Sequence, residues 1–177
     1  MSSPTNWMKK EYDDLVKKGF DWKPPVIGGP STGRAIIDDK ERIMLCANNY
    51  LSMSNHPKVK QAAIDAVKSH GAGSGSVRPI AGNMDIHNEL EDTIARFKNR
   101  EAALYYQTGF AVNSGLIPQL AGKNDSIISD QLNHGSIIDG VRLSGVKKEN
   151  RTIYAHNDMG ELEDRLKEAT EKSKKTL

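Results

Sequence analysis

The sequence predicts an α/β fold with a mostly parallel sheet flanked by helices. Short apolar strands are expected at 102–107, 125–130 and 152–156, with helices near 110–121 and 134–144 between them. A strand–helix–strand spacing of about 25 residues is typical of right-handed βαβ units. Three parallel strands make only a thin sheet. A parallel sheet also needs both of its faces covered. We therefore expect the sheet to be incomplete within this chain.

The N-terminal part is predicted to contain little compact structure. Residues 5–18 have an amphipathic pattern that ends at Gly19, which predicts a short helix. The segment 22–33 holds three prolines and three glycines, so we expect it to run over a surface as an arm. Two short strands, 35–37 and 42–46, are expected on either side of a polar turn.

The remaining chain has clear helix signals. We expect a helix over 57–70, since a proline stands at its first position and a glycine follows its end. Further helices are predicted to begin at Asp85 and just after Asp158. We therefore assign residues 1–56 to the N-terminal helix, arm and short strands, and residues 57–177 to the first part of a larger domain.

Composition excludes several classes of protein. The 25 basic and 23 acidic residues leave a net charge of +2, which predicts no field for nucleic acid or a membrane surface. The single Cys46 rules out an internal disulfide and fits a reducing compartment. We see no signal peptide and no stretch near the ~20 apolar residues of a membrane span, so we expect a cytoplasmic protein.

Two predicted strand-to-helix junctions are the strongest candidates for a binding site. Strand 102–107 leads into Gly109 and Phe110, and strand 125–130 leads into His134. Helix starts at strand ends favour phosphate, because their backbone N–H groups are unpaired. We expect the two junctions on neighbouring strands. The His134 ring would then either stack on a flat cofactor or pack at the helix start.

Other candidate motifs are weaker. The glycine-rich segment 71–76 follows a helix rather than a strand, which argues against a dinucleotide fingerprint. It is either a flexible loop or a loop lining a site shared between subunits. The adjacent Asn48 and Asn49 predict turn hydrogen bonds. We expect His87 to be hydrogen-bonded in a structural role and His156 to lie in a loop. No set of side chains has metal-ligand spacing.

Several stretches of the chain together resemble one family. They are Asn48–Leu51, Asn55–Pro57, His87–Glu91, Thr108–Phe110, Ile128–Leu143 and Tyr154–Asp158. In this combination they are similar to the α-oxoamine synthases, pyridoxal-phosphate enzymes of fold type I. The resemblance runs from about residue 5 to the end of the chain, and it is most specific over 128–143.

The resemblance implies particular roles for five residues. The backbone amides of Gly109 and Phe110 would hold the phosphate of pyridoxal 5′-phosphate, and His134 would stack on its pyridine ring. Asn48 would lie near the substrate carboxylate. Arg78 is assigned to substrate binding from a segment that reaches across a homodimer whose subunits share their active sites.

The resemblance also implies a reaction. The motifs are most similar to the glycine C-acetyltransferase branch, also called 2-amino-3-ketobutyrate CoA ligase. That branch interconverts glycine plus acetyl-CoA with 2-amino-3-ketobutyrate plus CoA. The alternative within the family is 8-amino-7-oxononanoate synthase, which uses alanine and a pimeloyl thioester. The alternative outside enzymes is a short protein that only dimerises or binds a phosphorylated ligand.

One departure from the family pattern bears on activity. The lysine that carries the cofactor lies in a Ser/Thr-x-x-Lys-x-x-Gly-Gly context, and no lysine here has that context. Family chains are also more than twice as long. We therefore expect this chain to be the N-terminal portion of such an enzyme and to be inactive alone.

Overall fold

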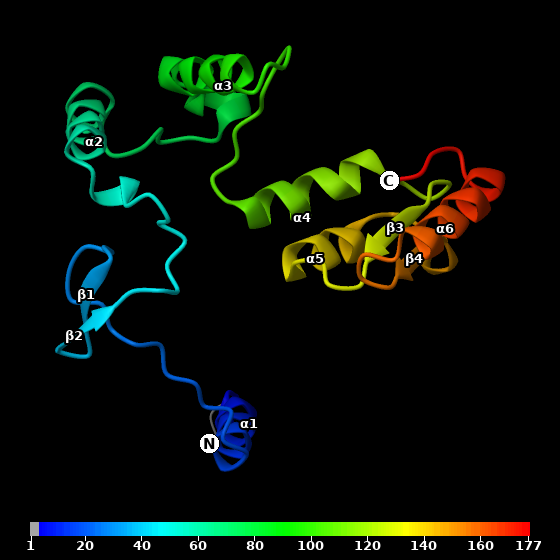
Figure 1. Cartoon of the computed structure of the whole chain (residues 1–177), viewed down its shortest axis with the longest axis horizontal. Helices are drawn as coiled ribbons and strands as arrows, with labels where there is room; N and C mark the ends of the chain where they lie inside the picture. Colours follow the sequence, from blue (N-terminus) through cyan, green and yellow to red (C-terminus); the bar gives the residue numbers. More distant parts are fainter. Residues whose placement is uncertain (1–3) are drawn as a thin grey trace. The chain divides into compact units, whose positions relative to one another are not determined.

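The computed structural model describes residues 4–177, and contacts divide the chain after Gly82 into two compact units, 1–82 and 83–177. Figure 1 labels the elements of each unit. The boundary predicted between residues 56 and 57 stays a prediction. Within residues 4–177, no helix has both the length and the apolar character needed to cross a bilayer.

The first unit contains short elements joined by long connections. Its elements are α1 (Asn6–Lys17), β1 (Arg34–Ile37), β2 (Lys40–Ile43), η1 (Met53–Asn55), α2 (Pro57–His70) and η2 (Arg78–Gly82). The predicted helix over 57–70 is confirmed. The side chain of His56 accepts a hydrogen bond from the Lys58 amide at its start, and Gly71 ends it with a φ of 82°.

The two short strands form an antiparallel hairpin, but the second strand differs from its prediction. Asp38 and Asp39 both have positive φ, 48° and 60°, which makes a tight two-residue turn. This turn places Lys40 directly opposite Ile37. The second strand consequently begins earlier than expected and ends at Ile43, so the predicted strand over 42–46 is wrong in its bounds.

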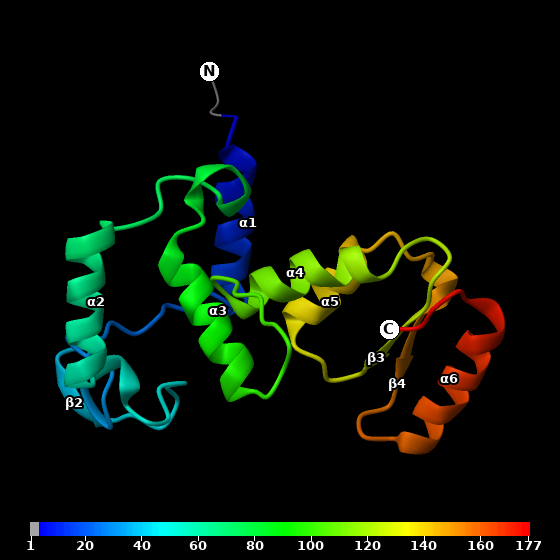
Figure 2. The same ribbon diagram turned by 90° about the horizontal axis from the view of Figure 1, so that it is seen from above.

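The second unit is an α/β arrangement. Its elements are α3 (Asp85–Phe97), α4 (Gly109–Leu120), β3 (Ile127–Asp130), α5 (Gly135–Leu143), η3 (Lys148–Asn150), β4 (Arg151–Tyr154) and α6 (Met159–Lys172). In Figure 2, α4 and α5 lie on one side of the two strands and α6 lies on the other. Helices thus cover both faces, as a parallel sheet requires.

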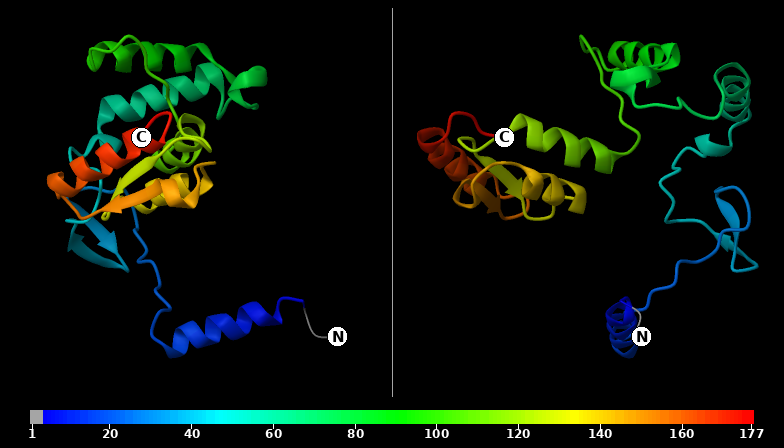
Figure 3. Two further views of the ribbon diagram at one scale, coloured as in Figure 1. Left: turned by 90° about the vertical axis from the view of Figure 1, so that its right-hand side faces the viewer. Right: turned by 180° about the vertical axis from the view of Figure 1, so that it is seen from behind.

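The central strand of this unit is β3. It pairs in parallel with β4, and the left view of Figure 3 shows the two strands side by side. Its other edge is bonded to the C-terminal segment 174–177. The Ser126 amide donates to the Lys175 carbonyl at 3.0 Å, and the Ile128 amide donates to the Leu177 carbonyl at 2.9 Å. The expected parallel sheet is therefore present, and the end of the chain is the third segment in it.

The predicted strand over 102–107 is not formed. Both edges of β3 are already occupied, so this segment has no partner on the central strand. The backbone amide of Tyr105 instead donates to the Glu91 carboxylate at 2.8 Å, and Leu104 is 65% exposed. An apolar segment forms a strand only where a free edge of another strand lies beside it. The prediction of a first strand over 102–107 is therefore wrong.

The core of the second unit lies between the sheet and the pair α4 and α5. Ala121, Ile127 and Val146 form its buried centre, with Ile117 and Val141 packed against them. Val146 is only 1% exposed. This core fixes the two helices that carry the candidate site.

The two helices approach closely at a glycine. A Cβ built at Gly140 would fall well inside contact distance of the Asn113 carbonyl oxygen and 2.9 Å from Cδ1 of Ile117. Only a residue without a side chain permits this approach. The backbone of α5 at Gly140 therefore packs directly against the backbone of α4 at Asn113.

Candidate functional site

The start of α4 presents two free backbone donors. Thr108 is extended, and its Oγ1 accepts from the Ala111 amide at 3.0 Å while its carbonyl accepts from the Val112 amide at 3.1 Å. Among the described residues, the amides of Gly109 and Phe110 have no hydrogen-bond partner. Apart from the adjacent residues and the backbone of its own helix, no atom lies within 4 Å of the position a Cβ would take at Gly109. These donors are open to a ligand.

The start of α5 carries an exposed imidazole in a defined state. Nδ1 of His134 accepts from the Ser136 amide at 3.1 Å and lies 2.7 Å from Ser136 Oγ. A ring nitrogen that accepts from an amide carries no hydrogen, so the hydrogen of the neutral ring is on Nε2. His134 caps the helix through one edge, and its ring remains exposed.

A part-buried hydrogen bond connects the first turns of the two helices. Asn113 Nδ2 donates to Ser136 Oγ at 2.9 Å, and Ser136 is 3% exposed. Asn113 faces the beginning of α5, and Ile117, one turn later, faces Gly140. The helices thus run in the same direction, and their N-termini lie at the same end. Gly109, Phe110 and His134 are grouped at this end although strand 102–107 is missing.

The first turns of both helices lack negative charge. Neither α4 nor α5 has an acidic residue in its first turn. The positive ends of both helix dipoles are therefore not neutralised within the first turns. Two free amides for a phosphate and an exposed aromatic ring at the same end are the features that a flat phosphorylated cofactor requires. These residues fit pyridoxal 5′-phosphate.

Asp130 is a residue of this region that the sequence analysis missed. It ends β3, and its Oδ1 accepts from the Leu132 amide at 2.7 Å and from His156 Nδ1 at 3.0 Å. The Leu132 amide first, and the His156 ring next, hold the pKa of Asp130 below its ordinary value. Burial, together with the Asp130 charge, raises the pKa of Tyr154. The two-residue step from Asp130 to the Leu132 amide is a local signal that could have been found in the sequence.

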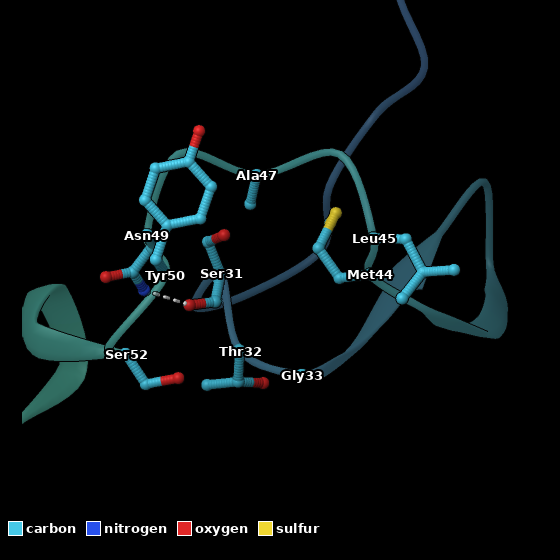
Figure 4. A pocket seen from close by; sticks show the side chains of 9 residues that line it. All are labelled: Ser31, Thr32, Gly33, Met44, Leu45, Ala47, Asn49, Tyr50 and Ser52. Carbon is cyan, nitrogen blue, oxygen red and sulfur yellow. Dashed lines mark hydrogen bonds between the residues drawn. The ribbon is translucent and has the colours of Figure 1, made fainter.

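The first unit contains a pocket next to Asn48. It has a volume of about 240 Å³ and is shown in Figure 4. Asn49 lines it, and both ends of its side-chain amide are used: Nδ2 donates to the Ser31 carbonyl at 2.8 Å, and Oδ1 accepts from the Ser54 amide at 3.2 Å. The bond with Ser54 is local, as expected of a turn, whereas the bond with Ser31 joins segments 18 residues apart in the sequence. Asn48 is exposed and does not line the pocket.

Arg78 begins a tightly folded segment of the same unit. It is half-buried at the start of η2, and the amides of Ile80 and Gly82 both donate to the Val77 carbonyl. A Cβ at Gly82 would collide with the Ser76 and Val77 backbone, so a glycine is required there. Asn48 and Arg78 belong to the first unit, whereas the three cofactor candidates belong to the second.

The other two histidines of interest lie where they were expected. His87 Nδ1 accepts from the Met84 amide at 3.0 Å and closes the start of α3, which is a structural role. His156 lies in the loop between β4 and α6. Its contact with Asp130 was not predicted.

Parallel strands followed by helices place the chain among the α/β proteins, in which ligands bind at the carboxyl ends of the strands. Comparison with known proteins gives the family. The sequence pattern described as "Aminotransferase class I and II" matches residues 40–177, most of the chain. The chain belongs to this family, whose members are pyridoxal-phosphate-dependent proteins of fold type I. The expected fold class and cofactor are thereby confirmed.

Individual relatives narrow the family to its α-oxoamine synthase branch. The chain is 47% identical to 8-amino-7-oxononanoate synthase of Alkaliphilus metalliredigens, over 97% of this chain and 42% of the relative. It is 49% identical to the enzyme of that name from Thermoanaerobacter pseudethanolicus, over 94% and 42%. The solved structure of Sphingomonas wittichii serine palmitoyltransferase matches with a TM-score of 0.83 at 30% identity, over 98% of this chain and 43% of that one. The chain spans about two fifths of the length of these relatives.

Proposed function

We propose that this chain is the N-terminal portion of a pyridoxal-phosphate-dependent acyltransferase that joins an amino acid to an acyl thioester. The grouped starts of α4 and α5 carry the proposal. The amides of Gly109 and Phe110 bind the phosphate, and His134 lies against the ring. Asn48 and Arg78 contact the substrate. When bound, the cofactor supplies an electron sink for the carbon that is acylated.

The relatives favour one pair of substrates. Several are named 8-amino-7-oxononanoate synthase. For an enzyme of that name, the family resemblance implies alanine and a pimeloyl thioester as substrates. We therefore propose these substrates for the complete enzyme. The sequence motifs alone favoured glycine and acetyl-CoA, but the comparisons give that pair no support. Turnover assays on the complete enzyme with each pair decide between them, and faster turnover of glycine with acetyl-CoA contradicts the proposal.

We also propose that the complete enzyme is a homodimer with shared active sites. Apolar side chains of α1 support this, since Trp7, Tyr12 and Leu15 are all about half exposed. Such a stripe on one helix needs a covering surface. Sedimentation of the complete enzyme is expected to give a dimer, and a monomer at micromolar concentration contradicts it.

Binding of the cofactor can be tested on the chain itself. Pyridoxamine 5′-phosphate is the suitable probe, because it has no aldehyde that could react with surface lysines. Pyridoxamine without the phosphate is its control. We expect calorimetry to detect binding of the phosphorylated probe and much weaker binding of the other. Equal affinity for the two contradicts a phosphate site.

A matched pair of variants at Gly109 tests the backbone donor. Gly109→Pro removes the amide hydrogen, and proline is tolerated at the first helical position after an extended residue such as Thr108. Gly109→Ala keeps the amide and has open space for its methyl group. Loss of a charge-assisted hydrogen bond predicts about tenfold or greater weakening for the proline variant alone. Equal affinity of the two variants contradicts the assignment.

A second pair tests stacking by His134. His134→Phe keeps a flat aromatic face and His134→Ala removes it. Because aromatic stacking contributes about 0.5–1.5 kcal/mol, the alanine variant should bind the probe about two- to thirteenfold more weakly than the phenylalanine variant. If the two variants bind alike, the ring has another role.

A further inference from the structure

The turn that carries His134 is held at its start by one carboxylate. Asp130 is the last residue of β3, and its side chain is only 16% exposed. Oδ1 of Asp130 accepts from the Leu132 amide at 2.7 Å, and the backbone carbonyl of Asp130 accepts from the Asn133 amide at 3.2 Å. The side chain of Asn133 then donates to Ser129 Oγ at 3.0 Å. The path of the turn from Asp130 to His134 is therefore set by Asp130 and its neighbours.

The same carboxylate joins this turn to the loop after β4. His156 Nδ1 lies 3.0 Å from Oδ1 and 3.2 Å from Oδ2, and the Asn157 amide donates to Oδ2 at 3.4 Å. A carboxylate only accepts, so Nδ1 of His156 must carry the hydrogen. The Gln131 amide, next to Asp130 in the sequence, donates to the Tyr154 carbonyl at 3.0 Å. Hydrogen bonds thus connect the loop after β3 to the loop after β4.

The geometry points to Asp130 as a positioning residue that, with His156, fixes the turn so that the His134 ring is held at the start of α5. Asp130 acts through the backbone of the turn. The identity of the ligand that contacts the His134 ring rests on the proposed function. The positioning of the ring does not rest on it, since the positioning depends only on contacts within this chain.

The two histidines give a spectroscopic test that does not require a ligand. His134 accepts at Nδ1 and so carries its hydrogen on Nε2, whereas His156 carries its hydrogen on Nδ1. Long-range ¹H–¹⁵N spectra distinguish these tautomers in the purified chain. The signals of the two rings are assigned by their loss in His134→Gln and His156→Ala.

Three variants separate the contacts of the carboxylate. Asp130→Ala removes all of them. Asp130→Asn keeps one acceptor for the Leu132 amide, and His156→Ala removes only the contact between the loops. We expect the His134 signal to change from the Nε2–H pattern to an average of both tautomers in Asp130→Ala, and to change less in the other two. Affinity for pyridoxamine 5′-phosphate should fall about two- to thirteenfold in Asp130→Ala, which is the loss expected when the His134 ring is no longer held in place for stacking.

The outcomes are distinguishable. An unchanged His134 pattern in a folded Asp130→Ala variant overturns the inference, and so does a change no larger than that in Lys147→Ala, an exposed control outside the turn. If Asp130→Ala does not fold, Asp130→Asn and His156→Ala decide, and two unchanged His134 patterns overturn it. If the wild-type chain does not bind the probe, the proposed function fails while the tautomer result still decides the positioning role.

Discussion

Gly140 offers the sharpest test of the helix pair that carries the site. In the variant Gly140→Ala, the new methyl group meets the Asn113 carbonyl oxygen and lies 2.9 Å from Cδ1 of Ile117. The Ile117 side chain can rotate away, because its end is flexible. The carbonyl belongs to the α4 backbone and cannot move unless the whole helix moves. We therefore expect α4 and α5 to separate at this point.

The size of the effect follows from two opposing contributions. Forcing a methyl group into a closely packed interior costs about 1–3 kcal/mol. Replacing glycine by alanine inside a helix contributes about 1 kcal/mol in the other direction. Because the clash involves backbone, the upper part of the first range applies. We expect Gly140→Ala to lower the free energy of unfolding by about 1–2 kcal/mol.

Gly135 is the matched control on the same helix. It is the first residue of α5, and no atom lies within 4 Å of a Cβ built there. Gly135→Ala should leave stability unchanged or raise it by up to about 1 kcal/mol. Urea unfolding followed by far-ultraviolet circular dichroism measures both variants. Equal stability of Gly140→Ala and Gly135→Ala refutes the close approach and, with it, the common end at which the two helix starts lie.

Three further predictions concern polar contacts in the second unit. Asp158 accepts from the Glu161 amide at 2.9 Å, so Asp158→Ala should lower the free energy of unfolding by about 1 kcal/mol and Asp158→Ser by much less, measured by urea unfolding. Thr108→Ala should cost a similar amount, about 1 kcal/mol, and Thr108→Ser should restore most of it; equal urea midpoints contradict the cap. The hydrogen bond from the Leu132 amide is the largest cause that lowers the pKa of Asp130. The ionised Asp130 carboxylate therefore stabilises the fold above its ordinary pKa of 3.8, and this stabilisation is lost as the pH falls through the lower pKa of the folded state. Asp130→Asn should weaken this acid dependence, which unfolding measured between pH 2 and pH 5 checks.

The helices were predictable because their boundaries depend on neighbours in sequence. The proline at 57 and the glycine at 71 bound α2 as expected, and Asp158 caps α6 through its own side chain. Each of these signals acts over a few residues, so tertiary contacts do not need to be known.

The strand over 102–107 shows where local patterns fail. Its apolar residues satisfy the pattern of a buried strand as well as those of β3 do. Strand formation needs a free edge beside it, and both edges of β3 are taken by β4 and by 174–177. Which strand occupies which edge is decided by contacts between distant residues. The sequence pattern could therefore identify 102–107 as a segment suited to a strand, but it could not predict which strand, if any, the segment would pair with.

The candidate site divides in the same way. The free amides of Gly109 and Phe110 follow from the position of a helix start, and that position is a local property. The contact between Asp130 and His156 depends on the register of β3 against β4, which pairs Asp130 with Tyr154. His156 then falls two residues beyond the pairing, at the height of the carboxylate. A shift of one residue in register would move every side chain of β4 to the opposite face and separate the pair. The register of two short parallel strands, set by the buried core around Ile127, thus determines how the turn before His134 is held.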